Sequence, residues 1–196
     1  GVGRHIYRPL VCSTTDKLEP VDCYFDKAGK GSLKSFVEHY TNEYNETKDY
    51  GYAAMPTCSH DIWRLNRLGR STPEELKAAL TFFLTLPAPP IVYYGEEIGM
   101  RNLEYAQPKE GSQSSRNRST CRTPMQWSAD VNAGFSTAPS ESLYLPADDS
   151  PGFPNVEDSE KDPMSVLNYV RGLLELRAAI PALGTRGDWK FISDPD

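Results

Sequence analysis

The stretch YAAMPTCSHDIWRLNRLGRSTPEELKAALTFFLTLPAPPIVYY, residues 52–94, holds the pattern that decides the fold. Two short apolar runs, 52–58 and 90–94, are bounded by polar or glycine residues, and their length favours buried strands over helices. Between them, Thr72-Pro73-Glu74-Glu75 combines a threonine N-cap, a proline at the first helical position and a glutamate three residues after the cap. The pattern therefore predicts a helix over 73–86 that joins two parallel strands.

The flanking segments continue the alternation of strands and helices. Apolar residues at spacings of three and four predict one helix over 32–48 and another over 163–180, opened by Asp162-Pro163. Residues 21–25 and 189–192 resemble short strands, and the polar segment 96–161 predicts a long loop, which is either functional or disordered. This order indicates an α/β fold with a parallel sheet, although two or three strands cannot close a barrel.

The composition excludes two classes of partner. No apolar run in the 196 residues approaches the length of a membrane span, so no membrane association is expected. The net charge is −6, and apart from three arginines within residues 116–122 the basic residues do not cluster, so nucleic-acid binding is not expected.

The cysteines and histidines carry no metal or disulfide pattern. The three histidines are far apart in the sequence, which predicts neither a metal site nor a cofactor. The cysteines show no CxxC spacing, which favours free thiols in a reducing cytoplasm. They are Cys12, Cys23, Cys58 and Cys121.

Two polar segments follow the carboxyl ends of the predicted strands, where reacting groups gather in a parallel α/β barrel. They are Ser59-His60-Asp61-Ile62-Trp63-Arg64 and Gly95-Glu96-Glu97-Ile98-Gly99. Carboxylates accept hydrogen bonds from sugar hydroxyls, cationic side chains donate to them, and a negative charge stabilises an oxocarbenium-like transition state. From these residues alone, a structural loop at 60–61 and a buried structural carboxylate at 97 stay open as alternatives.

Four ordered motifs resemble glycoside hydrolase family 13, the α-amylase family. Residues 56–64 (PTCSHDIWR) resemble its NHDxxR segment, and residues 84–100 (LTLPAPPIVYYGEEIGM) resemble its eighth barrel strand. Residues 122–128 (RTPMQWS) with 132–136 (NAGFS) are similar to the RTPMQW…NAGF signature of the branch containing α-glucosidases, oligo-1,6-glucosidases and trehalose synthases. The helix ending LLELRAAIPAL, residues 173–183, resembles the same branch.

The resemblance implies the C-terminal portion of a (β/α)8 TIM barrel, from its sixth to its eighth helix, plus the first strand of a C-terminal β-sandwich. Residues 21–184 would form the partial catalytic barrel, and residues 185–196 would begin the β domain. Residues 1–20 do not resemble the family, so they stay unassigned and their native origin stays open.

The same resemblance implies roles for five residues. Asp61 would be the family's third carboxylate, which grips sugar hydroxyls and stabilises the transition state, and His60 would hydrogen-bond the same ring. Arg122 and Arg64 would contact the substrate, and Glu97 would support the site from beneath.

The sequence also departs from the family pattern. Ser59 stands where asparagine is usual, and neither the GFRxD nucleophile segment nor the acid/base glutamate is found at its expected place. The predicted function is therefore a fragment of a retaining enzyme that hydrolyses α-glucosidic bonds in short oligosaccharides, inactive by itself. A trehalose synthase and a non-catalytic scaffold of the same family are the alternatives. The uncovered edges of a partial barrel also predict self-association.

Overall fold

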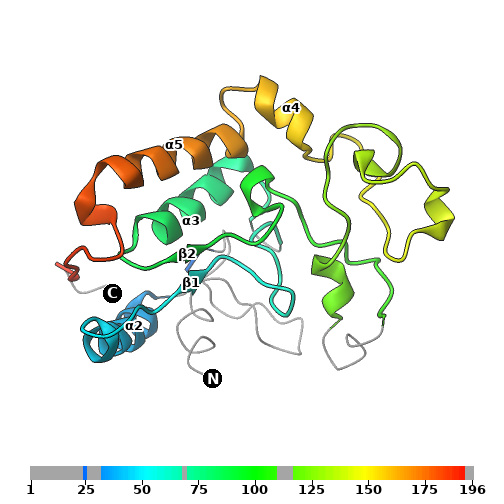
Figure 1. Cartoon of the computed structure of the whole chain (residues 1–196). Helices are drawn as coiled ribbons and strands as arrows, with labels where there is room; N and C mark the ends of the chain where they lie inside the picture. Colours follow the sequence, from blue (N-terminus) through cyan, green and yellow to red (C-terminus); the bar gives the residue numbers. More distant parts are fainter. Residues whose placement is uncertain (1–23, 26–31, 68–69, 110–116, 193–196) are drawn as a thin grey trace.

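A short parallel sheet lies between helices in this computed structural model, which describes residues 24–25, 32–67, 70–109 and 117–192. Helices α3 (Pro73–Thr85) and α5 (Val166–Ala179) lie on one side of the strands, and α2 (Lys34–Thr47) lies on the other (Figure 1). Strands alternate with helices along the chain, as the sequence pattern predicts for an α/β unit.

The two strands set the direction of the site. β1 (Met55–Pro56) pairs in parallel with β2 (Pro90–Ile91), and Met55 lies opposite Pro90. The predicted strands 52–58 and 90–94 therefore have the right positions but are much shorter in the structure. Because parallel strands end at the same edge, the segments that follow residues 58 and 94 meet there.

Helix α3 begins at the predicted capping box. The Oγ1 atom of Thr72 accepts a hydrogen bond from the backbone N–H of Glu75 at 3.4 Å, and the Glu75 carboxylate accepts from the N–H of Thr72 at 3.1 Å. Two orphan donors of the first turn are thereby satisfied. The buried side chains of α3 face the core: Leu76, Ala79, Leu80, Phe83 and Leu84.

The remaining helices confirm the predicted pattern with shifted ends. Helix α2 covers most of the predicted range 32–48. Helix α5 is capped by Ser165, whose Oγ accepts from the N–H of Asn168 at 3.1 Å, so the predicted helix start at Asp162-Pro163 is wrong. Pro163 lies in the turn between α5 and a short helix, α4 (Val156–Lys161). The described part of the long loop contains α4 and four single 3-10 turns: η1 (Glu96–Ile98), η2 (Arg118–Cys121), η3 (Val131–Gly134) and η4 (Ser140–Ser142).

The C-terminal segment corrects another prediction. Residues 185–192 form no strand in the structure and follow the 3-10 turn η5 (Pro181–Leu183) irregularly. Trp189 lies edge-on to Tyr40 of α2, with ring centroids 4.8 Å apart, so the segment packs onto the core of the unit already described. The domain boundary at residue 184 stays a prediction. Of the predicted strand 21–25, Tyr24 and Phe25 lie in a turn and the rest lies outside the described residues.

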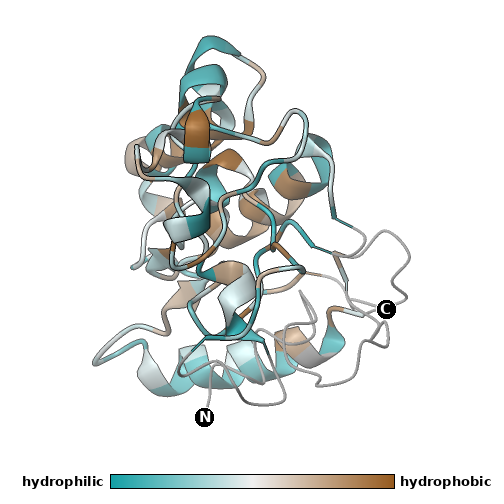
Figure 2. Ribbon diagram, turned by 90° about the vertical axis from the view of Figure 1, so that its right-hand side faces the viewer, coloured by the Kyte–Doolittle hydropathy of each residue, from teal (hydrophilic) through white to brown (hydrophobic). Residues whose placement is uncertain are grey.

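One apolar core joins the strands and helices. It runs from Phe36 of α2 through Met55 of β1 and Phe83 of α3 to Val170 of α5. In Figure 2 the helices carry hydrophobic stretches, in brown, beside hydrophilic stretches, in teal. No described helix is long and apolar enough to cross a membrane. Ile91 in β2 is half exposed, and self-association through such strand surfaces stays a prediction.

Candidate functional site

An aspartate that accepts hydrogen bonds from two arginines lies just beyond the carboxyl end of β1. The Oδ1 atom of Asp61 accepts hydrogen bonds from Arg118 Nη1 at 2.7 Å and from Arg122 Nη2 at 3.1 Å. Arg118 is the first residue of η2, and Arg122 directly follows its last residue. The structure thus brings the predicted pair Asp61 and Arg122 together, and 48% of the Asp61 side chain stays exposed.

His60 completes this cluster of polar groups. Its Nε2 atom lies 3.5 Å from Asp61 Oδ2, and its backbone carbonyl accepts a hydrogen bond from Arg122 Nε at 2.9 Å. Arg122 therefore fixes both residues of the His-Asp pair. The hydrogen bond from Arg118 lowers the pKa of Asp61 below its ordinary value, against a smaller opposing effect of burial. The carboxylate is ionised at neutral pH.

Arg118 makes the shorter of the two arginine contacts, and sequence reasoning did not assign it to the site. It belongs to the cluster of arginines at 116–122, which the composition singles out only as an exception to the scattered basic residues. That cluster, which ends on the first residue of the RTPMQW motif, was the signal available in the sequence.

Arg64 forms a buried layer beneath the cluster. Its side chain is fully buried, and its guanidinium donates to the carbonyl of Tyr94 at 2.5 Å and to the carbonyl of Cys121 at 3.2 Å. It also lies over the Tyr94 ring, 4.7 Å from the centroid. The fully buried side chain therefore positions the backbone next to Arg122, and the substrate contact predicted for Arg64 stays a prediction.

Glu96, and not Glu97, is the carboxylate of this buried layer. Its Oε2 atom accepts from the N–H of Leu65 at 3.2 Å, and its Oε1 atom lies 3.6 Å from Arg64 Nη1. Burial raises the pKa of Glu96 to about 7, and the Arg64 charge offsets part of that effect. Glu97 is the more exposed of the two, and the supporting role predicted for it stays a prediction.

The turn at Gly95 explains why Glu96 is buried and Glu97 is more exposed. Gly95 has a φ of 83°, and a Cβ atom there would clash with the side chain of Met100, so only glycine fits. The η1 turn that follows directs Glu96 into the core and leaves Glu97 at its edge. Strand periodicity alone gives no information about such a turn.

Two buried thiols flank the cluster without taking part in its chemistry. The Sγ atoms of Cys58 and Cys121 lie 3.5 and 3.7 Å from the Ser59 carbonyl oxygen. Burial raises the pKa of both thiols, so neither is a reactive thiolate at neutral pH. Both are free, as predicted, and Cys12 and Cys23 lie outside the described residues.

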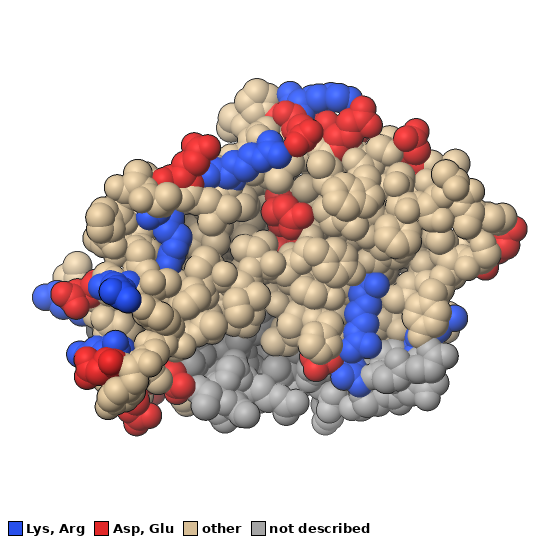
Figure 3. Space-filling view, viewed as in Figure 1, with Lys and Arg blue, Asp and Glu red and all other residues tan. Residues whose placement is uncertain are grey.

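The groups around the site can both accept and donate hydrogen bonds. An ionised, half-exposed carboxylate accepts hydrogen bonds, and the adjacent guanidinium and imidazole groups donate them. Figure 3 shows acidic and basic side chains interspersed on the visible face, without a large basic patch. Among the described residues no group of three or more His, Cys, Asp or Glu could hold a metal ion. Two cavities, of about 580 and 500 Å³, are lined by other residues and do not include Asp61.

Comparison with known proteins identifies the family to which the chain is similar. The family model described as "Alpha amylase, catalytic domain" matches residues 18–185. The trehalose synthase of Thermus thermophilus is 37% identical over 150 residues, which cover 72% of this chain and 14% of that protein. Maltase A2 of Drosophila melanogaster is 33% identical over 203 residues, which cover 94% of this chain and 34% of that protein.

Solved structures agree with the sequence relatives. The isomaltulose synthase from Erwinia rhapontici NX5 superposes with a TM-score of 0.66 at 27% identity, over 79% of this chain and 32% of that one. The chain thus spans at most about a third of the length of the relatives named here.

Proposed function

Because the chain belongs to the alpha-amylase family, we propose that it is part of an enzyme that acts on α-glucosides, with short oligosaccharides as substrates and hydrolysis as the reaction. The observation that carries this proposal is the ionised Asp61 held by Arg118 and Arg122 at the carboxyl end of β1. The names of the relatives, among them a maltase and trehalose synthases, support the same class of substrate.

Each residue of the cluster has a role in this proposal. Asp61 accepts hydrogen bonds from the hydroxyls of a glucosyl ring, and its charge stabilises the positive charge that develops at the anomeric carbon. His60 and Arg122 donate to hydroxyls of the same ring. Arg118 orients the carboxylate, and Arg64 positions the backbone beneath.

The chain by itself is proposed to bind sugar without cleaving it. Retaining hydrolysis needs a carboxylate nucleophile and an acid/base carboxyl group about 5–5.5 Å apart. The sequence contains no GFRxD segment at a strand end, and no glutamate stands about fourteen residues before residue 21. Incubation with p-nitrophenyl α-glucoside should release no nitrophenol above the buffer rate. Release that disappears in Asp61→Ala would overturn this part of the proposal.

Calorimetric titration with maltose tests the binding role of Asp61. The variant Asp61→Asn keeps the size of the side chain but removes the charge that holds both arginines. We expect its affinity for maltose at this site to fall at least about tenfold, equivalent to about 1.4 kcal/mol. Asp130→Asn, an exposed aspartate hydrogen-bonded to Ser128, is the matched control and should bind like the unmodified chain. Equal affinities in all three proteins would refute the role.

A trehalose synthase is the second candidate, because several relatives with 31–37% identity carry that name. Such an enzyme binds maltose as substrate and trehalose as product. Trehalose should then compete with maltose at the Asp61 site with similar affinity, whereas an α-glucosidase specific for maltose should bind trehalose much more weakly. Complete absence of sugar binding would favour the scaffold alternative.

The free thiols are relevant to the cellular compartment in which the protein is located. Cys58 and Cys121 are unpaired in the structure, which supports the proposed cytoplasmic location, where thiols stay reduced. Thiol counting on protein freshly isolated under alkylating conditions tests this, since an oxidised pair would contradict it.

A further inference from the structure

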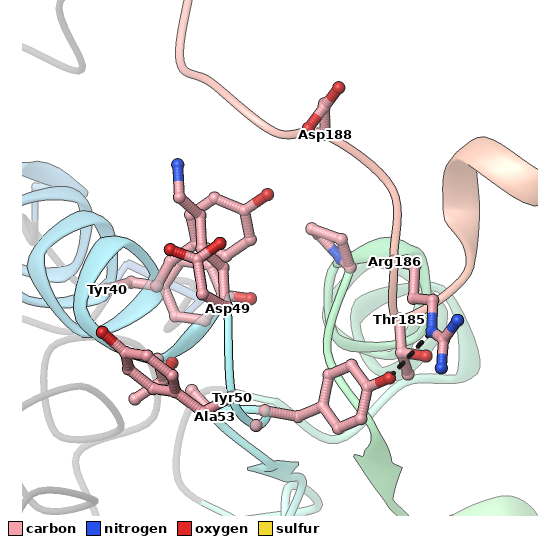
Figure 4. A pocket seen from close by; sticks show the side chains of 13 residues that line it. Tyr40, Asp49, Tyr50, Ala53, Thr185, Arg186 and Asp188 are labelled. Atoms are coloured by element: carbon pink, nitrogen blue, oxygen red, sulfur yellow. Dashed lines mark hydrogen bonds between the residues drawn. The ribbon is translucent and has the colours of Figure 1, made fainter.

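A cavity of about 580 Å³ lies at the opposite end of β1 from Asp61. Its walls come from the end of α2, the residues just before β1 and the C-terminal segment (Figure 4). Tyr52 and Ala53 line it and precede β1, whereas Asp61 follows β1. A ligand here would leave the Asp61 cluster open. The volume falls within the range of about 300–1,000 Å³ that is usual for small-molecule sites.

Four tyrosines contribute to the lining, so we call it the tyrosine cavity: Tyr40, Tyr44, Tyr50 and Tyr52. Tyr50 is 87% exposed and Tyr52 is 49% exposed, so neither ring is used to build the apolar core. A tyrosine offers an apolar ring face beside a polar hydroxyl. A sugar ring presents the same combination, with C–H groups on its faces and hydroxyls at its rim.

The walls of the tyrosine cavity are held in place by contacts between distant segments. Arg186 Nε donates to the Tyr52 hydroxyl at 3.1 Å, which is the dashed contact in Figure 4. The Tyr44 hydroxyl donates to the Gly187 carbonyl at 3.3 Å. These bonds join α2 and the strand entry to the C-terminal segment. A preformed wall lowers the entropic cost of binding.

The charges of the lining favour a neutral ligand. Lys48 and Arg186 contribute two positive charges, and Asp49 and Asp188 contribute two negative charges, so their sum is zero. An anion or a cation would meet an equal number of repulsive groups. A polyhydroxylated ligand, in contrast, can donate to the carboxylates and accept from the cations.

We propose that the tyrosine cavity is a second sugar-binding site, which takes a glucosyl unit of an α-linked oligosaccharide by stacking on Tyr50 or Tyr52 and hydrogen bonding to Arg186 and Asp49. The identity of the sugar rests on the proposed function, but the site does not share a residue with the Asp61 cluster. It therefore binds independently.

Calorimetric titration of the whole chain with maltotriose tests the proposal. The unmodified chain should bind two sugars. Tyr50→Ala and Tyr52→Ala should each weaken one site about tenfold or more, and Tyr52→Phe, which keeps the ring, should weaken it less. Tyr144→Ala, an exposed tyrosine outside the cavity, is the matched control and should leave both sites unchanged.

The variants distinguish this inference from the proposed function. In Asp61→Asn, the site sensitive to Tyr50 and Tyr52 should persist. A single site that is lost in Asp61→Asn and unaffected by both tyrosine variants would overturn the inference. A single site that is lost in Tyr50→Ala and unaffected in Asp61→Asn would support it while refuting the role of Asp61. If Tyr52→Ala does not fold, Tyr50→Ala decides, because its ring is almost fully exposed.

Discussion

Replacement of Arg64 by methionine should destabilise the buried layer beneath the candidate site. Methionine has a similar length but no charge and no donor, so the carbonyls of Tyr94 and Cys121 lose their partner and Glu96 stays buried without its cation. Removing one partner of a buried ion pair costs about 3–5 kcal/mol. We expect a loss of this size in the free energy of unfolding at pH 8.

The loss should depend on pH because of Glu96. Its pKa in the folded chain, about 7, lies above the ordinary glutamate value of 4.5, so the folded state binds the proton more tightly. The contribution of Glu96 to the free energy of unfolding is present in full below pH 4.5 and is lost as the pH rises through 7. The difference between the two pKa values corresponds to a loss of about 3 kcal/mol, at about 1.36 kcal/mol per pKa unit. Without the offsetting charge of Arg64 the fall becomes larger. Arg64→Met should therefore cost less at pH 5 than at pH 8.

Urea unfolding followed by tryptophan fluorescence at pH 5 and pH 8 measures both effects. Arg171→Met is the matched control, because the contacts of Arg171, an ion pair with Glu160 and a hydrogen bond to Asn168, are exposed at the surface, and their loss should cost less than about 1 kcal/mol. Adding Glu96→Gln to Arg64→Met should remove most of the difference between the two pH values. A loss under about 1 kcal/mol, or an equal loss at both pH values, would refute the role assigned to the buried pair.

Three smaller perturbations test other parts of the structure. Thr72→Ala should lower the free energy of unfolding by about 1 kcal/mol in urea titrations, because the capping box is lost, and no change would contradict the cap. With the other two cysteines replaced by serine, Cys58 and Cys121 should not react with a thiol reagent at pH 8 until urea unfolds the chain; immediate reaction would show that the thiols are accessible. Arg118→Met should raise the pKa of Asp61 toward its ordinary value in a carbon-13 NMR titration, and an unchanged pKa would mean that Arg118 does not hold the carboxylate.

The sequence predicted those elements that depend on interactions between neighbouring residues. The cap at Thr72 requires only residues 72–75, so both the start and the buried face of α3 follow from the sequence. The positions of the strands follow from two apolar runs, but the length of each strand depends on the strand that pairs with it. β1 and β2 pair with each other over two residues, and hydrogen bonds between them fix only that overlap.

The parts that the sequence did not predict depend on contacts between distant segments. Trp189 has strand-like neighbours in sequence, yet its ring packs on Tyr40, 149 positions earlier, and the segment stays irregular. Arg118 carries no periodic signal, and only the fold of the long loop brings it to Asp61. The choice between Glu96 and Glu97 depends on a single left-handed glycine turn.

A crystal structure of the chain soaked with maltose tests the central claim most directly. The account predicts a glucosyl ring whose hydroxyls lie within hydrogen-bond distance of the Asp61 carboxylate and of His60, above the buried guanidinium of Arg64. Maltose bound only in the tyrosine cavity, or absent from Asp61 at concentrations that saturate the chain in solution, would contradict it.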